Sequence, residues 1–102
     1  MDDLQTLGGN IELIGFKEID PASMIVFKKI LGNHARKFKE RCAEFQKLSL
    51  RVKTVHETPT NVKYELQGTV INAGKMYSSK VTDRNLFFVL DKVLKKIENE
   101  LR

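Results

Sequence analysis

The stretch of sequence that decides the fold is Val81-Thr-Asp-Arg-Asn-Leu-Phe-Phe-Val-Leu-Asp-Lys-Val-Leu-Lys-Lys-Ile-Glu-Asn-Glu-Leu101. Its apolar residues recur every three or four positions, which is the spacing of one face of an α-helix. Thr82 and Asp83 are good N-cap residues, so the helix is predicted to begin there. Three lysines lie away from the apolar line: Lys92, Lys95 and Lys96. The stretch therefore predicts a helix that buries one side and presents a basic side to solvent.

A second, longer helix is predicted earlier in the chain. It begins at Asp20-Pro21, where aspartate is a good N-cap and proline suits the first helical position. An apolar stripe with steps of three or four then continues to Phe45, which corresponds to about six helical turns. The stripe consists of Met24, Phe27, Leu31, Ala35, Phe38, Cys42 and Phe45.

Four segments are predicted to form β-strands: Asn10–Phe16, Leu48–His56, Val62–Val70 and Lys75–Val81. In the second and third of them apolar and polar residues alternate, as they do in half-buried strands. The predicted order is therefore β-α-β-β-β-α. Short turns between the later strands imply mainly antiparallel pairing. Two amphipathic helices must cover one face of this sheet, so we predict an α+β two-layer sandwich with a four-stranded sheet. Arg51, Lys53 and Lys63 are expected on the uncovered face.

The length and composition are those of a single domain. A chain of 102 residues supports one modest core. We expect residues 1–9, which end in Gly8-Gly9, to form a flexible lead, and residues 10–102 to form one α+β domain. No apolar run approaches the ~20 residues needed to span a bilayer, and the first residues do not resemble a secretory signal. With Cys42 as the single cysteine, these features predict a cytoplasmic protein.

The charge balance favours an anionic partner. Eighteen Lys and Arg residues oppose 13 Asp and Glu residues, which gives a net charge of +5 and a pI near 9.4. Such an excess favours nucleic acid first, and an acidic protein or a membrane surface second. The alternative is a soluble domain that is simply basic.

Residues for catalysis or cofactor binding are not apparent in the sequence. His34, His56 and Cys42 do not stand at the spacing of a metal site, and Cys42 continues the apolar stripe as a packing residue. Gly8-Gly9 precedes a strand, which is the wrong context for a phosphate-binding loop. Ser78-Ser79 has no nearby histidine, and the carboxylates are scattered. We therefore expect no enzymatic activity, no metal, no cofactor and no small-molecule substrate.

The positive charge gathers on the predicted helices. Lys28, Lys29, Arg36 and Lys39 are expected along one flank of the first helix, and Lys92, Lys95 and Lys96 on the second. If the helices pack side by side, these seven residues share a surface suited to the phosphates of a nucleic acid backbone. The alternative is two ordinary solvated helix faces, with Asp91–Lys95 and Lys96–Glu100 as i,i+4 ion pairs.

The chain resembles the short form of the ribosome hibernation-promoting factor family, also called protein Y or ribosome-associated inhibitor. The resemblance extends over residues 10–101, where the family has a similar order of strands and helices. It is closest in the segment Asn85–Leu101. There, Asp91 matches the family's aspartate, Phe87 its aromatic residue and Lys96 one of its lysines.

The resemblance implies a protein that binds ribosomal RNA in the channel of the small ribosomal subunit. Such a protein blocks messenger and transfer RNA and keeps idle ribosomes inactive. Its RNA contacts come from basic residues on the helices, which correspond here to the seven residues named above. We expect a monomer when the protein is free. Two alternatives remain: a stand-alone reader of double-stranded RNA, and a small protein-interaction domain that exposes a sheet edge.

Overall fold

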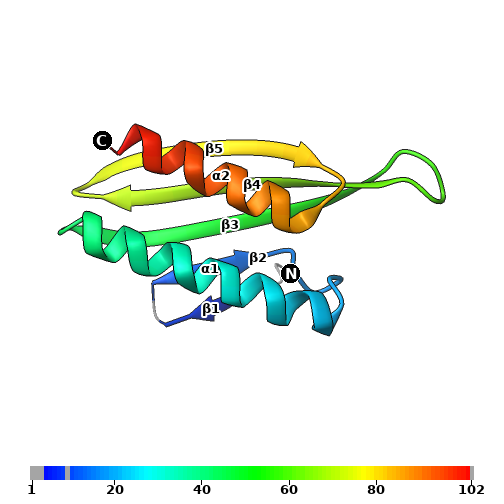
Figure 1. The fold of residues 1–102 in the computed structure, drawn as a ribbon, viewed down its shortest axis with the longest axis horizontal. Helices are drawn as coiled ribbons and strands as arrows, with labels where there is room; N and C mark the ends of the chain where they lie inside the picture. The colour runs from blue at the N-terminus through cyan, green and yellow to red at the C-terminus, as the bar shows by residue number, and fades with distance from the viewer. Residues whose placement is uncertain (1–3, 9, 102) are drawn as a thin grey trace.

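Five β-strands form one sheet, in which each strand lies beside the next one in the sequence, and two α-helices lie on one face of the sheet (Figure 1). The computed structural model describes residues 4–8 and 10–101. The elements in chain order are β1 (Leu4–Leu7), β2 (Ile11–Ile14), α1 (Pro21–Arg41), β3 (Phe45–His56), β4 (Val62–Asn72), β5 (Lys75–Asp83) and α2 (Leu86–Glu100). The prediction of an α+β fold with two helices on one sheet is confirmed.

The sheet is mixed. β2 and β3 pair in parallel, with Ile11 opposite Leu48, because α1 carries the chain back between them. The β1–β2, β3–β4 and β4–β5 pairs are antiparallel. The prediction of a mainly antiparallel sheet therefore agrees with most of the pairs, and the crossover through α1 accounts for the parallel one.

The sheet has one strand more than the four predicted. β1 pairs with β2 as a hairpin, with Leu4 opposite Ile14 and Leu7 opposite Ile11. This strand lies within residues 1–9, which the sequence predicts as a flexible lead. Residues 1–3 and 9 of that lead lie outside the described residues. The four residues of β1 are too few, beside two glycines, for the sequence to predict a strand. β1 forms because its backbone can pair with the edge of β2.

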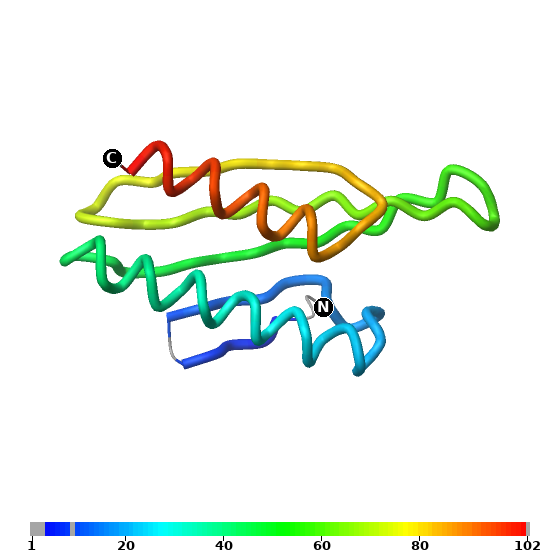
Figure 2. Tube along the Cα trace, viewed as in Figure 1, coloured from blue at the N-terminus to red at the C-terminus, as the bar shows by residue number. Residues whose placement is uncertain are grey.

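The core lies between the sheet and the two helices. Leu48, Leu50 and Val52 of β3 are buried, and the residues between them point to the other face of the sheet. From the helices, Phe27 and Leu90 are completely buried against them. Figures 1 and 2 show α1 and α2 side by side in front of the sheet, with the β3–β4 hairpin extending beyond them.

The first helix is shorter than predicted. Asp20 caps it as expected, since its Oδ2 accepts a hydrogen bond from the Ser23 amide at 3.0 Å. The helix ends at Arg41 with Cys42 as its C-cap, four residues before the predicted end at Phe45. Phe45 instead begins β3 and stacks on Phe38, with ring centroids 6.3 Å apart. Phe45 lies three residues after Cys42, so it continues the spacing of the apolar stripe although it belongs to a strand. The predicted helix was too long for this reason.

The second helix begins later than predicted. Its N-cap is Asn85, whose Oδ1 accepts hydrogen bonds from the Phe87 amide at 2.9 Å and the Phe88 amide at 3.1 Å. Thr82 and Asp83, the predicted caps, are the last two residues of β5. Pairing of Asp83 with Tyr64 holds Asp83 in β5, so the helix begins after it and Asn85 becomes its cap.

Candidate nucleic-acid interface

The two helices are parallel and joined along a polar seam. His34 Nε2 lies 3.2 Å from Asp91 Oδ1, and Arg41 Nη1 lies 3.4 Å from Glu98 Oε1. The His34–Asp91 contact spans 57 residues of sequence, and the Arg41–Glu98 contact spans the same number. Equal separations mean that both helices run in the same direction. Their outward faces therefore form one continuous surface on the side away from the sheet.

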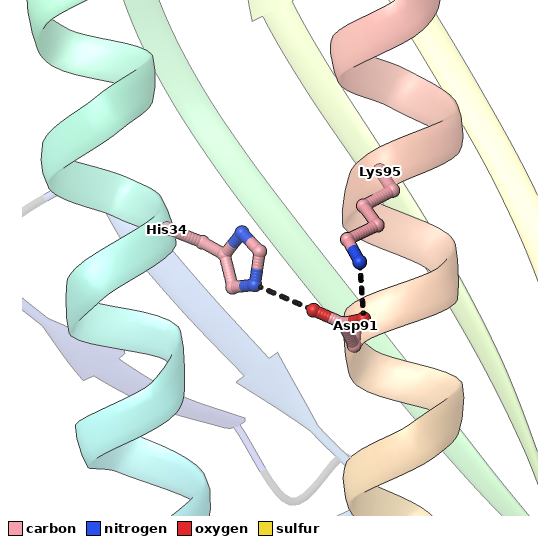
Figure 3. A network of polar contacts seen from close by, with 3 residues as sticks. All are labelled: His34, Asp91 and Lys95. Atoms are coloured by element: carbon pink, nitrogen blue, oxygen red, sulfur yellow. Dashed lines mark hydrogen bonds and ion pairs between the residues drawn. The ribbon is translucent and has the colours of Figure 1, made fainter.

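The centre of the seam is a three-residue network (Figure 3). His34 is 8% exposed. Asp91 accepts from it through Oδ1, and Lys95 Nζ lies 3.0 Å from Asp91 Oδ2. The hydrogen bond with Lys95 and, to a smaller extent, the one with His34 hold the pKa of Asp91 below its ordinary value of 3.8. The ionised carboxylate thus fastens α2 to α1 and also neutralises part of the charge of Lys95.

All seven residues predicted to bind RNA are solvent-exposed. They do not form a single cluster. On α1, Lys29 and Arg36 are seven residues apart, which places them on the same side of the helix two turns apart. Arg36 Nη2 donates to Asn33 Oδ1 at 3.0 Å, a neutral partner that leaves its positive charge uncompensated.

Lys28 and Lys39 lie on the flank of α1 that faces away from α2. Lys28 lines a hollow with Gln5 of β1 and with Ile25, at the edge of the sheet opposite to α2. Lys39 is eleven residues further on, three helical turns, and so follows the same flank. These two residues therefore face a different direction from Lys29 and Arg36.

The three lysines of α2 also differ in their surroundings. Lys95 is paired with Asp91, as described above. Lys92 Nζ lies 5.4 Å from the centre of the Phe88 ring, a cation–π contact on the helix surface. Lys96 is one turn beyond Lys92, on the side away from the acidic residues that meet α1. Phe88 is 45% exposed, whereas Phe87 packs against the core.

Lys37 belongs to this surface and was not among the predicted residues. It lies three residues after His34 and four before Arg41, both of which contact α2. Lys37 therefore lies on the side of α1 that is nearer to α2, and it forms no ion pair within the described residues. The sequence could not assign Lys37 to this surface, because the side of α1 on which α2 lies is determined by how the two helices pack. We define the helix surface as Lys29, Arg36, Lys37, Phe88, Lys92 and Lys95.

Other kinds of site are less well supported by the described part of the chain. No group of three or more His, Cys, Asp or Glu gathers there to hold a metal ion. No helix within residues 4–8 and 10–101 is long and apolar enough to cross a membrane. Cys42 is buried and lines a hollow of about 310 Å³ with Phe38, Arg41 and Glu98. The ion pair of Arg41 and Glu98 occupies the polar side of that hollow.

No model of a protein family matches the chain, and no curated protein matches it either.

Proposed function

We propose that the protein binds RNA through the helix surface and acts as a ribosome-associated dormancy factor. Bound to RNA of the small ribosomal subunit, it blocks the access of messenger and transfer RNA and so inhibits translation. The observation that carries the RNA-binding part is the parallel pair of helices, whose shared outward surface presents Lys29, Arg36, Lys37 and Lys92 without a carboxylate partner among the described residues.

The charge of the whole chain supports an RNA partner. A net charge of +5 attracts polyanions over distances longer than any single contact. Exposed lysine and arginine side chains along two helices can neutralise successive phosphates, which gives affinity without base recognition. Phe88 adds an exposed aromatic ring beside Lys92, which is suited to stacking on an unpaired base.

The choice of the ribosome among RNA partners rests on the family resemblance. The order β2-α1-β3-β4-β5-α2 supports it, and so does the segment Asn85–Leu101, in which Asp91 matches the family's aspartate. The position of Asp91 gives this match a physical reason, because its carboxylate joins the two helices that carry the basic residues. A substitution of Asp91 would remove the contact between the two helices that carry the proposed RNA-binding surface.

Cosedimentation with purified small ribosomal subunits tests the proposal. We expect saturable binding at near-physiological salt. Changing Lys29, Arg36 and Lys92 to Gln should weaken it at least about tenfold, since one charged contact is worth about 1.5 kcal/mol or more. The matched control changes Lys53, Lys63 and Lys75 to Gln. It removes the same charge from positions off the helices and should leave binding within about twofold of the wild type if local contacts, not net charge, set the affinity.

Three outcomes would contradict parts of the proposal. Equal loss in the helix variant and the control would show that general charge attraction, not the helix surface, determines binding. Naked duplex RNA that competes as well as the subunit would favour a stand-alone double-stranded RNA reader. Absence of the protein from the subunit fraction, together with no effect on translation by purified ribosomes, would remove the dormancy function.

A further inference from the structure

Both helices lie on the same face of the sheet (Figures 1 and 2), so no helix of the described residues covers the opposite face, which we call the open face. Because Leu48, Leu50 and Val52 point toward the helices, Ser49, Arg51 and Lys53 point the other way. The pairing register then places Arg51 between two neutral neighbours, Ile14 of β2 and Gln67 of β4. Arg51 thus lies in the middle of the open face.

A hollow of about 350 Å³ surrounds Arg51. Its lining residues are Ile14, Ser49, Arg51, Gln67 and Thr69. Ser49 lies opposite Thr69 in the β3–β4 register, so both hydroxyl groups stand on the same side of Arg51. The hollow therefore combines a guanidinium group with two hydroxyls and an amide, and its lining contains no carboxylate.

Arg51 also differs in its charge balance from several lysines of the sheet, although Lys53 beside it likewise has no carboxylate partner among the described residues. Three lysines of β3, β4 and β5 have glutamate partners at 2.7–3.1 Å: Lys47 with Glu12, Lys63 with Glu57 and Lys80 with Glu65. Arg51 is exposed and has no carboxylate partner within the described residues. Its positive charge is therefore available at the hollow, while the charges of those lysines are largely compensated.

We propose that this hollow binds a backbone phosphate of RNA, which gives the protein a second RNA contact on the side opposite to the helix surface. A guanidinium group presents its donors as a planar fork that matches two phosphate oxygens. The Ser49 hydroxyl and the Gln67 amide supply further donors around the same point. The Thr69 hydroxyl lies 3.3 Å from Ser78 Oγ, and it can donate to the anion while it accepts from Ser78. The hollow takes a tetrahedral anion and holds its oxygens from several directions.

The lining favours a phosphate over a base or a protein partner. No aromatic side chain lines the hollow, so it offers no platform for stacking a base. Ile14 is its single apolar residue, whereas the centres of protein interfaces are rich in aromatic and apolar anchors. This inference rests on the proposed RNA binding of the helix surface. Together the two faces let one molecule hold two RNA segments, one on each side of the sandwich.

An RNA-bridging experiment tests the second contact. Two duplex RNAs of about 16 base pairs, one carrying a donor and one an acceptor dye, are mixed with the full chain. Energy transfer between the dyes reports simultaneous binding on both faces, and anisotropy of one labelled duplex reports binding of a single RNA. We expect Arg51→Gln to reduce bridging about tenfold, because a charged hydrogen bond is lost, and to leave most of the single-RNA binding intact.

Two further variants show whether the hollow or only its charge matters. Arg51→Lys keeps the charge but loses the fork, and we expect an intermediate loss of bridging. Lys53→Gln removes the same charge two residues along β3, outside the hollow, and we expect bridging within about twofold of the wild type. Since both positions are exposed, thermal unfolding of each variant should match the wild type.

Each outcome supports or overturns the inference. Bridging that is unchanged in Arg51→Gln, or reduced equally by Lys53→Gln, would show that the hollow is not the second contact. If poly-glutamate displaces RNA from the open face as well as unlabelled RNA does, the hollow recognises acidic polymers and its assignment to RNA is wrong. Failure of the proposed function would give a different result. The variant with Lys29, Arg36 and Lys92 changed to Gln would then bind a single RNA as well as the wild type does, whether or not Arg51→Gln reduces bridging.

Discussion

At the scale of single residues, Gly68 is a point of close approach between α2 and the sheet. A Cβ atom there would lie 2.6 Å from Val93 Cγ1 and 3.3 Å from Ile97 Cδ1. Valine is branched at Cβ and cannot easily rotate away from such a contact. The absence of a side chain at position 68 therefore sets the distance between α2 and β4, and with it the position of the lysines on the outer side of α2.

Substitution of Gly68 should therefore destabilise the fold. We expect Gly68→Ala to lower the free energy of unfolding by roughly 1–3 kcal/mol, as overpacking of a core does. Gly32→Ala is the matched control: Gly32 lies inside α1 with no atom near its would-be Cβ, and alanine there should add about 1 kcal/mol. Urea unfolding measures both. A stabilised Gly68→Ala protein would mean that α2 packs less closely than described.

Asp91 makes the stability depend on acid pH. Folding lowers the pKa of Asp91, chiefly through the hydrogen bond with Lys95, so the folded state binds its proton less readily than the unfolded state does. The stabilisation is therefore complete above the ordinary value of 3.8 and is lost as the pH falls through the lowered pKa.

Comparison of the wild type with Asp91→Asn measures this contribution. The wild type should be more stable at neutral pH by about 0.5–1 kcal/mol, since the carboxylate is partly exposed and screened by water. The difference should shrink as the pH is lowered from about 4, where aspartate begins to titrate in the unfolded chain. A difference that stays constant between neutral pH and pH 3, or thereabouts, would contradict an ionised Asp91 at the seam.

At the scale of elements, the beginning of α2 depends on one side chain. Asn85 satisfies two amides of the first turn, those of Phe87 and Phe88. Asp83 instead accepts from the Asn85 amide, at 3.2 Å, and so orders the residue before the helix. The amphipathic pattern of α2 shows which face of the helix is buried, but only the N-cap determines the residue at which the helix begins.

Cap substitutions distinguish the observed start from the predicted one. We expect Asn85→Ala to cost about 1 kcal/mol of stability, the usual value of an N-cap. Thr82→Ala, at an exposed position in β5, should change the stability by less than about 0.5 kcal/mol. Equilibrium unfolding of the two variants is the measurement. A larger effect at Thr82 would move the cap back to the position that the sequence alone suggested.

At the scale of the whole molecule, the sandwich has two different exposed sides. One carries the helix surface, and the other is the open face of the sheet with Arg51 at its centre. Acidic residues are engaged on both sides: Glu12 and Glu65 compensate lysines of the sheet, and Asp91 and Glu98 contact basic residues at the seam between the helices. Basic residues without a carboxylate partner among the described residues remain on each side: Lys29, Arg36 and Lys92 on the helix side and Arg51 on the open face.

The salt dependence of RNA binding should reveal how many phosphates each side contacts. The logarithm of the association constant should fall linearly with the logarithm of salt concentration. Each lysine or arginine that contacts a phosphate should reduce the slope by about 1 when it is removed. The variant with Lys29, Arg36 and Lys92 changed to Gln should therefore lose about 2–3 from the slope, measured by fluorescence anisotropy. An unchanged slope would mean that these residues do not contact the RNA.

The sequence by itself determined the α+β fold, the approximate position of both helices and the face that each one buries. Those features follow from local periodicity, as the stripe from Met24 to Phe38 and the later stripe from Leu86 to Ile97 show. It also placed all seven predicted basic residues on exposed positions and Arg51 on the uncovered face.

Only the tertiary structure decided which of those residues act together. β1 forms because β2 offers it an edge, Phe45 leaves the helix for β3, and Asn85 becomes the cap because Asp83 is held in β5. The contacts of His34 with Asp91 and of Arg41 with Glu98 set the parallel alignment of the helices, which brings Lys37 beside α2 and leaves Lys28 on the far flank. Periodicity gives the direction from a helix to the core, but the direction from one helix to the other depends on side chains far apart in sequence.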